Sequence, residues 1–290
     1  MAQCITPYYV RNNKPYGFNQ SNWLPVPCGK CPICLARRSE GWIFRLKQQQ
    51  KVSTNFNFIT LTYNDENLPR TINGLATLKR SDLTNFFKRL RKLHGKSQTL
   101  KYYACGEYGS TFKRPHYHII LFNANPRYVS LAWKLQGKEL GHVDIGDTTR
   151  GAIAYVTGYV MKGKIVPEHS RDDREKEYSV MSKGLGGNYI NERTERYHTT
   201  DPLNCYLTEP GGKKIPMPRY YKDKLFSEEH RFIQAKAFCK KGHKDALKRE
   251  QLYKIQYGTT EGYIKHQNEH RQHLIRETKK KSFASRKLAQ

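Results

Sequence analysis

The chain has 290 residues, 37% of them hydrophobic, and carries 52 Lys and Arg against 25 Asp and Glu, a formal net charge of +27. This length and apolar content suffice for one large domain, or one domain with appended elements, and leave too little for two independent domains. The excess positive charge indicates a polyanionic partner, for which nucleic acid is the natural candidate. No apolar run approaches the roughly 20 residues of a membrane-spanning helix, which argues against a membrane protein.

Aromatic residues accompany this charge, with 20 tyrosines and 12 phenylalanines. Because aromatic rings stack on unpaired bases, the composition favours single-stranded over duplex nucleic acid, although most such rings fill the core of a protein. The N-terminal residues lack the charged and apolar regions of a secretory signal, so we expect a cytoplasmic protein. Seven cysteines, three of them tightly clustered, indicate reduced thiols or metal ligands rather than a disulfide framework.

The N-terminal third of the chain contains signals for two helices and a strand. Residues 1–52 predict a Cys-rich knuckle followed by a helix over 35–52. The β-branched and aromatic residues 56–63 predict a first strand. A helix should follow from Ser81, as its N-cap, to Gly95, because apolar residues recur between them at helical spacing.

A hairpin and a second strand–helix pair follow. Residues 100–107 and 115–122 predict strands joined by a connection short enough for a hairpin, so the two should be antiparallel neighbours. A helix around 129–135, a strand over 141–146 and a helix over about 149–162 complete the order β-α-β-β-α-β. This is the split βαβ plan of an α+β, ferredoxin- and RRM-like fold, which implies an antiparallel sheet with helices on one face and the other face free.

The predicted sheet and its helices define a core over residues 53–165. Charged stretches and Gly- and Pro-rich turns over 166–226 predict an irregular segment wrapped on that core. Over 227–290, Gly and Pro become scarce and charge becomes dense, which predicts a basic helical region.

His116 and His118 are two positions apart in the third predicted strand, so both imidazoles should point to one face. With 11 histidines in the chain, a surface or packed pair explains this spacing equally simply. If the hairpin loop is centred near Thr111, Glu107 lies opposite His116 on the same face; otherwise it is a solvated loop residue. Two imidazoles and a carboxylate would leave positions on Mg²⁺ or Mn²⁺ open to phosphate oxygens, where the ion would polarise a phosphodiester.

Tyr155 and Tyr159 are four positions apart on the last predicted core helix, which places both hydroxyls on one face, and Lys162 shares that face. A tyrosine can attack phosphorus and leave a phosphotyrosine link to a DNA 5′ end. The alternative is a core-facing pair, because 20 tyrosines make this spacing no rarer than chance.

Cys28, Cys31 and Cys34 lie within seven residues, and Cys4 is the obvious fourth thiolate, a pattern that indicates a metal site. Tetrahedral Zn²⁺ is the expected ion. The spacing also resembles that of ferredoxins, so an iron–sulfur cluster stays open, although the usual fourth Cys followed by Pro is missing. Unligated thiols are the remaining alternative.

The order of these motifs resembles a known family. His116-Tyr117-His118 after Arg114-Pro115, followed by Tyr155-Val156-Thr157-Gly158-Tyr159-Val160-Met161-Lys162, looks like the HUH endonucleases that initiate rolling-circle replication, in their two-tyrosine form. Phe58-Ile59-Thr60-Leu61-Thr62-Tyr63 resembles the first motif of that group.

Two further segments are similar to the replication initiators of gokushovirus-type microviruses. They are Val26–Cys34 and Gly211–Lys222. The resemblance extends from about Cys4 to Phe226, and the ordered combination is more specific than any single motif.

The resemblance implies that His116 and His118 ligate the metal. It also implies that Tyr155 or Tyr159 is the nucleophile and that Lys162 helps to position phosphate or substrate. The tyrosines follow the histidines, as in replication initiators and unlike relaxases.

Glu107 as a third ligand depends on the hairpin geometry and on a similar placement in related initiators. The expected function is therefore a nickase that cuts single-stranded DNA or a stem-loop at a replication origin and later rejoins the strands. Host replication machinery is the expected protein partner, in the bacterial host cytoplasm if the chain is viral. The alternatives are a non-catalytic single-stranded nucleic-acid-binding protein with an RRM-like sheet and zinc knuckle, and a metal-dependent phosphodiesterase without a covalent step.

Overall fold

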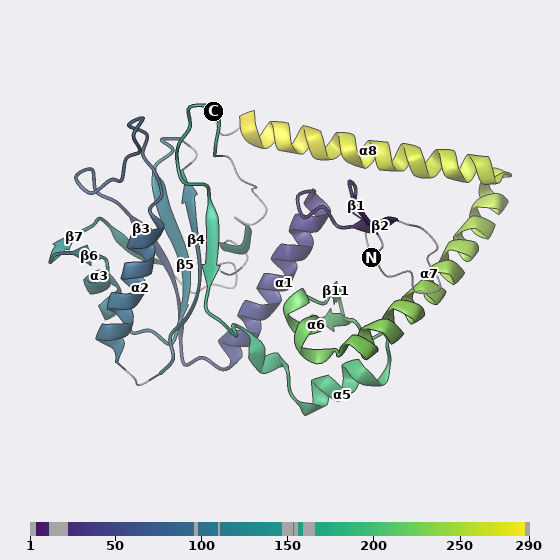
Figure 1. Ribbon diagram of the computed structural model, residues 1–290, viewed down its shortest axis with the longest axis horizontal. Helices are drawn as coiled ribbons and strands as arrows, with labels where there is room; N and C mark the ends of the chain where they lie inside the picture. Colours follow the sequence, from purple (N-terminus) through teal and green to yellow (C-terminus); the bar gives the residue numbers. More distant parts are fainter. Residues whose placement is uncertain are drawn as a thin grey trace. The chain divides into compact units, whose positions relative to one another are not determined.

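The computed structural model describes residues 4–11, 23–95, 98–109, 111–146, 153, 156–158 and 166–287. The chain forms two compact units. The first, Trp42–Tyr189, contains the main sheet, and the second combines Met1–Gly41 with Ile190–Ala289. The division falls within the first helix, α1 (Pro32–Lys51), so this helix contributes residues to both units (Figure 1).

A five-stranded antiparallel sheet forms the centre of the Trp42–Tyr189 unit, in the order β8-β3-β5-β4-β9. Its strands are β3 (Phe56–Thr62), β4 (Lys101–Tyr108), β5 (Pro115–Phe122), β8 (Val143–Gly146) and β9 (Tyr178–Met181). The central strand β5 is almost entirely buried, because it has a neighbour on each side and an apolar cluster on each face. The α+β class and the antiparallel sheet expected from the sequence are confirmed.

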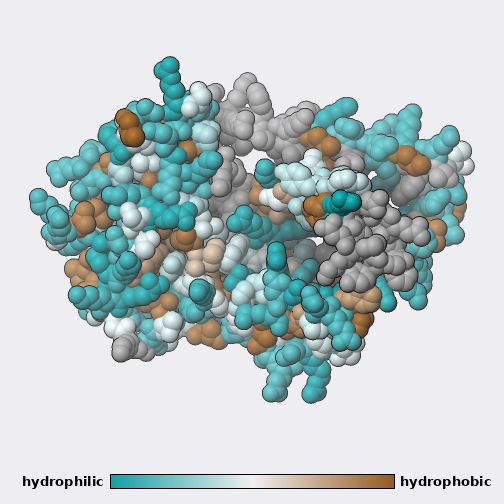
Figure 2. Space-filling model, viewed as in Figure 1, coloured by the Kyte–Doolittle hydropathy of each residue, from teal (hydrophilic) through white to brown (hydrophobic). Residues whose placement is uncertain are grey.

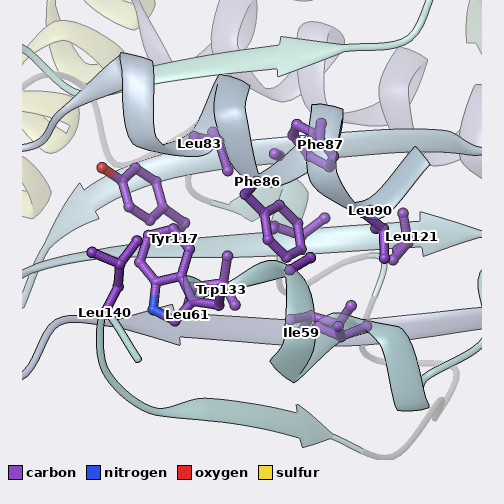
Figure 3. Packing of buried hydrophobic residues seen from close by; sticks show 14 of the residues in the cluster. Ile59, Leu61, Leu83, Phe86, Phe87, Leu90, Tyr117, Leu121, Trp133 and Leu140 are labelled. Atoms are coloured by element: carbon purple, nitrogen blue, oxygen red, sulfur yellow. The ribbon is translucent and has the colours of Figure 1, made fainter. Parts of the chain in front are cut away.

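The first face of the sheet packs against α2 (Arg80–His94), whose buried residues recur at helical spacing. Figure 3 shows Phe86 and Leu90 of this helix directed at the sheet, where Ile59 and Leu121 meet them. The helix begins at Arg80, with Lys79 and not Ser81 as its N-cap. The shift has a local cause, because the buried Tyr117 hydroxyl bonds both the amide and the carbonyl of Lys79.

Two short elements follow β5 on the way to β8. The helix α3 (Arg127–Ala132) contributes buried side chains to the core under α2. A small hairpin of β6 (Lys134–Leu135) and β7 (Lys138–Glu139) then leads the chain back to the sheet.

The second face of the sheet corrects one detail of the sequence prediction, since helices lie on both faces and not on one. A second apolar cluster forms there around Tyr103, Ile120 and Phe122, covered by Leu46 of α1 and by Val156 (Figure 1). The expected free face is thus confined to the polar end of the same strands.

Close packing holds the 42–51 part of α1 against the chain that follows β9. The Arg45 guanidinium donates two hydrogen bonds, of 3.0 and 2.9 Å, to the Leu185 carbonyl. Gly186 has a φ of +70°, and a Cβ there would lie 2.3 Å from the Arg45 carbonyl oxygen, so a side chain cannot be accommodated. The 3₁₀ turn η1 (Gly187–Tyr189) ends this unit.

The segment 166–226, expected to be irregular, contains regular elements. Besides β9 and η1, they are α5 (Glu192–Thr200), the hairpin of β10 (Tyr206–Thr208) and β11 (Lys214–Pro216), and α6 (Arg219–Leu225). Asn191 caps α5 through a capping box with Thr194. The strands are too short for their alternation to be distinguished from a loop.

The remaining elements of the second unit are a hairpin of β1 (Tyr8–Arg11) with β2 (Trp23–Val26), and two long helices, α7 (Glu228–Tyr257) and α8 (Thr260–Lys287). The long helices match the expected basic helical region, whereas the hairpin was not predicted. Among the described residues, no helix combines the length and apolarity that a bilayer-crossing segment needs. Hydrophilic residues cover most of the described surface seen in Figure 2.

Candidate functional site

The polar end of the second sheet face is built by strand register. Glu107 on β4 is paired directly with His116 on β5, and Cys105 with His118. On the other side of β5, Thr60 of β3 is paired with His118. Because directly opposed residues share a face and side chains alternate along a strand, Glu107, both histidines and Thr60 all point to one side of the sheet.

Two imidazole nitrogens converge on a single carboxylate oxygen. The distances to Glu107 Oε1 are 2.8 Å from His116 Nε2 and 3.2 Å from His118 Nε2. The side chains of His116, His118 and Glu107 are 17%, 7% and 12% exposed, so the group is largely shielded while retaining access to solvent.

Hydrogen bonds on the far side of each ring fix its orientation. His116 Nδ1 lies 3.0 Å from the Arg114 carbonyl oxygen, which can only accept, so Nδ1 carries the proton and Nε2 of the neutral ring has a free lone pair. His118 Nδ1 lies 3.1 Å from the Thr60 hydroxyl, and Phe58 stacks on the ring of His118. Such outer contacts are typical of metal-binding histidines, because they direct the other nitrogen at the ion.

The spacing of the three donor atoms fits a hard divalent cation. Adjacent ligands of an octahedral ion with bonds of about 2.0–2.1 Å lie roughly 2.9 Å apart. The observed separations of 2.8 and 3.2 Å agree with that value, and the three ligand atoms all lie within 4.8 Å of one another. Lone pairs on two nitrogens and a carboxylate repel at this distance unless positive charge lies between them. Glu107, His116 and His118 are therefore suited to hold Mg²⁺ or Mn²⁺ with positions left for other ligands.

A second group of metal-binding character lies in the other unit. The thiols of Cys4, Cys28, Cys31 and Cys34 come within 4.8 Å of one another. Burial raises the pKa of Cys28, but hydrogen bonds from the Thr6 hydroxyl and from backbone amides outweigh it and lower the value to about 6.

Known proteins resemble this chain over most of its length. The profile of the ORF2 family of replication-associated proteins matches residues 56–164. The replication-associated protein ORF2 of Spiroplasma virus 4 is 30% identical over 237 residues, which cover 74% of this chain and 71% of that protein. This chain belongs to that family of replication-associated proteins.

Two further relatives carry the same designation. The replication-associated protein VP4 of Bdellovibrio phage phiMH2K is 29% identical over 218 residues, 68% of this chain and 66% of its own. The replication-associated protein ORF4 of Chlamydia phage 1 is 29% identical over 237 residues, 72% of this chain and 56% of its own. No solved structure matches this member of the family.

The expected tyrosines and lysine of this replication-associated protein, Tyr155, Tyr159 and Lys162, lie outside the described residues. Their sequence neighbours are described: Ile153 and Val156 are buried in the apolar cluster of the second face, on the same side of the sheet as the histidines.

Two residues of the site were not singled out from the sequence. Thr60 contacts His118 directly, and Asp144 on β8 is paired with Thr60, which puts its carboxylate on the histidine face. The available signal was alternation, since both belong to predicted strands, but the register between β3 and its two neighbours depends on contacts distant in sequence.

Proposed function

We propose that this replication-associated protein is an origin-specific endonuclease that cuts single-stranded DNA through a covalent 5′-phosphotyrosine intermediate and later rejoins the strand. The observation that carries the proposal is the convergence of His116 and His118 on Glu107, within the part of the chain that the family profile matches. An initiating role in rolling-circle replication agrees with the designation of its relatives.

Glu107, His116 and His118 would hold the divalent ion. When bound, that ion supplies positive charge beside a scissile phosphate. The protein's own contribution is to hold both rings in place through Arg114 and Thr60, so that no reorganisation is needed when phosphate oxygens arrive.

Tyr155 or Tyr159 would be the nucleophile. Its hydroxyl oxygen forms a bond to phosphorus, the bond from phosphorus to the 3′ oxygen breaks, and the tyrosine's proton ends on the released 3′-hydroxyl. Lys162 would position the phosphate. The burial of Ile153 and Val156 on the histidine side of the sheet supports this assignment, since these residues flank Tyr155 in the sequence. Two tyrosines would allow cutting and rejoining in successive rounds, with the freed 3′ end extended by host replication machinery in the host cytoplasm.

The hairpin loop between β4 and β5 supports a single-stranded substrate. Phe112 is 88% exposed in this loop, which joins Glu107 and His116 of the candidate site. An exposed ring suits stacking on unpaired bases, and the net charge of +27 suits the phosphate backbone.

The decisive experiment incubates the full chain with 5′- and 3′-labelled single-stranded origin DNA and Mn²⁺. A denaturing gel should show a protein–DNA adduct that carries only the label on the 3′ side of the cut. Tyr155→Phe and Tyr159→Phe tested separately assign the two tyrosines, and the double variant should form no adduct. His118→Ala should abolish cleavage while the protein stays folded.

Other outcomes would refute the proposal. Free cleavage products without an adduct would indicate a phosphodiesterase that uses water. Binding without cleavage of any stem-loop substrate would indicate a non-catalytic nucleic-acid-binding protein. Tyr102→Phe, a tyrosine of the opposite sheet face, serves as the control for loss of a hydroxyl and should leave the adduct intact.

A further inference from the structure

The four thiols of the N-terminal region are brought together from distant parts of the sequence. Cys4 comes from the segment before β1, Cys28 and Cys31 from the turn after β2, and Cys34 from the first turn of α1. All four sulfur atoms lie within 4.8 Å of one another, and Cys4 Sγ is 3.8 Å from Cys31 Sγ. Tetrahedral zinc with Zn–S bonds of about 2.3 Å places its sulfur ligands roughly 3.8 Å apart.

This separation distinguishes a single ion from a cluster. In an iron–sulfur cluster, each cysteine binds a different iron or shares the cluster with bridging sulfides, so the cysteine sulfurs are held farther apart than ligands of one ion. Four thiols within 4.8 Å leave space for one ion only.

The backbone around the thiols is arranged for negatively charged sulfur. The amides of Lys30 and Cys31 donate to Cys28 Sγ at 3.4 and 3.2 Å, and the amide of Cys28 donates to Cys4 Sγ at 3.3 Å. Cys34 lies in the first turn of α1, where the helix dipole favours an anion. These donors stabilise thiolates, the form in which cysteine binds metal.

Apolar side chains enclose the group. Ile5 is buried in the same cluster as the cysteines, and Ile33 and Ile275 pack against it. Three of the four cysteines are themselves buried. Since four like-charged thiolates would repel strongly in such a setting, the arrangement requires a cation to be stable.

We propose that Cys4, Cys28, Cys31 and Cys34 bind one structural Zn²⁺ ion that fastens the N-terminal segment to the start of α1. The site goes beyond the proposed nicking reaction, because its residues belong to the other unit and include none of the candidate catalytic groups. Zinc binding contributes to folding in such small sites, because the unfolded chain has no preformed ligand set.

Metal analysis of the full chain tests the proposal. Protein purified without chelator and dialysed against Mg²⁺ should retain about one zinc and no iron per chain by mass spectrometry. Titration with an organomercurial should release this zinc as thiols are modified. Cobalt substitution of the unmutated protein should give the intense thiolate-to-cobalt absorption of a four-sulfur site, a readout that needs no variant to fold.

Variants separate this site from the nicking site. Cys31→Ser should lose the zinc, whereas the control Cys239→Ser, at an exposed thiol of α7, should retain it. The double variant His116→Ala/His118→Ala should keep its zinc even if it cleaves nothing, so failure of one proposal is distinguishable from failure of the other. Absence of both zinc and the cobalt–thiolate absorption would overturn the proposal, as would iron accompanied by acid-labile sulfide.

Discussion

The hydroxyl of Thr60 is a contact to the candidate metal centre that a single isosteric change can remove. It lies 3.1 Å from His118 Nδ1, on the far side of the ring from Glu107. Thr60→Val keeps the shape and removes the hydrogen bond, so we expect Mn²⁺ affinity to fall by roughly 10- to 100-fold with the fold unchanged. Direct Mn²⁺ binding by electron paramagnetic resonance measures this change, and the Mn²⁺ concentration for half-maximal cleavage should rise in parallel.

Thr62→Val is the matched control for this variant. Thr62 is on the same strand and face, but its hydroxyl bonds the His142 carbonyl. Equal Mn²⁺ affinity in the Thr60 variant and the unmutated protein would show that the hydroxyl does not orient the ring.

Phe112 provides a test of substrate contact that leaves the metal centre intact. Because its ring is 88% exposed, Phe112→Ala should not destabilise the protein. Stacking of one base on an aromatic ring is worth about 1–3 kcal/mol, so we expect single-strand affinity to fall between about 5- and 100-fold by fluorescence anisotropy. Phe112→Trp should retain binding, and unchanged affinity in the alanine variant would rule out a stacking role.

At the scale of the element, β5 serves the metal centre with one face and the core with the other. Tyr117 lies between the two histidines but points to the opposite face, where burial raises its pKa to about 12. Its hydroxyl lies 2.9 Å from the Tyr63 hydroxyl and bonds both backbone groups of Lys79 at the start of α2. Tyr117 is therefore a structural residue and not a nucleophile, although it is the tyrosine nearest the histidines in sequence.

Tyr117→Phe should destabilise the protein, because it leaves buried polar groups of Lys79 and Tyr63 without their partner. The expected loss is about 1–3 kcal/mol in the free energy of unfolding, measured by urea denaturation. Tyr102→Phe, on the neighbouring strand, should cost less, since its ring stacks on Phe87 and the change preserves that contact. Equal stability of the Tyr117 variant and the unmutated protein would contradict the structural role.

The segment after Val166 is held by an ion pair that predicts a pH dependence. Arg174 donates to Asp172 at 2.8 and 2.7 Å, and these bonds outweigh burial and hold the pKa of Asp172 well below its usual value. Since the folded pKa is depressed, the stabilisation is fully present above the unfolded pKa of about 3.9 and is lost as pH falls through the folded value.

Asp172→Asn should therefore lower the free energy of unfolding by roughly 1.5–3 kcal/mol near neutral pH. The difference from the unmutated protein should shrink below about pH 4, where the native carboxyl begins to protonate. Denaturation curves across this range measure it, with Asp245→Asn, at an exposed position of α7, as the control. A difference that stays constant down to pH 3 would contradict the assigned pKa direction.

The predictable parts of the fold are those with long, regular patterns. The spacing of Leu83, Phe86 and Leu90 identified α2, and the short connection between β4 and β5 identified the hairpin on which the Glu107 pairing depends. Short elements escaped, because β9 has four residues and pairs with a strand some 75 positions earlier, a contact that no local pattern encodes. Coverage of the second sheet face was missed for the same reason, since the apolar stripe of α1 does not specify which surface it meets.

At the scale of the whole molecule, the net charge of +27 is distributed beyond the sheet. The part of α7 around Cys239 to Arg249 has every residue exposed, on all sides of the helix. A helix that is polar all round gains little from core packing, so its side chains are available to an external partner. Lysines at positions 240, 241 and 244 give this stretch a dense positive charge suited to a phosphate backbone.

Replacing Lys240, Lys241 and Lys244 together with Gln should weaken single-stranded DNA binding and reduce its dependence on salt. Each phosphate contact to a single strand contributes about 0.7 to the slope of log K against log salt concentration, so three lost contacts reduce the slope by about 2. Anisotropy titrations over a range of salt concentrations measure the slope, and circular dichroism checks that α7 remains helical. Replacing the same lysines with Arg conserves the charge and should leave the slope unchanged. If the Gln variant keeps the original slope, the charge of α7 does not contact the DNA, and the sheet unit must supply the phosphate contacts by itself.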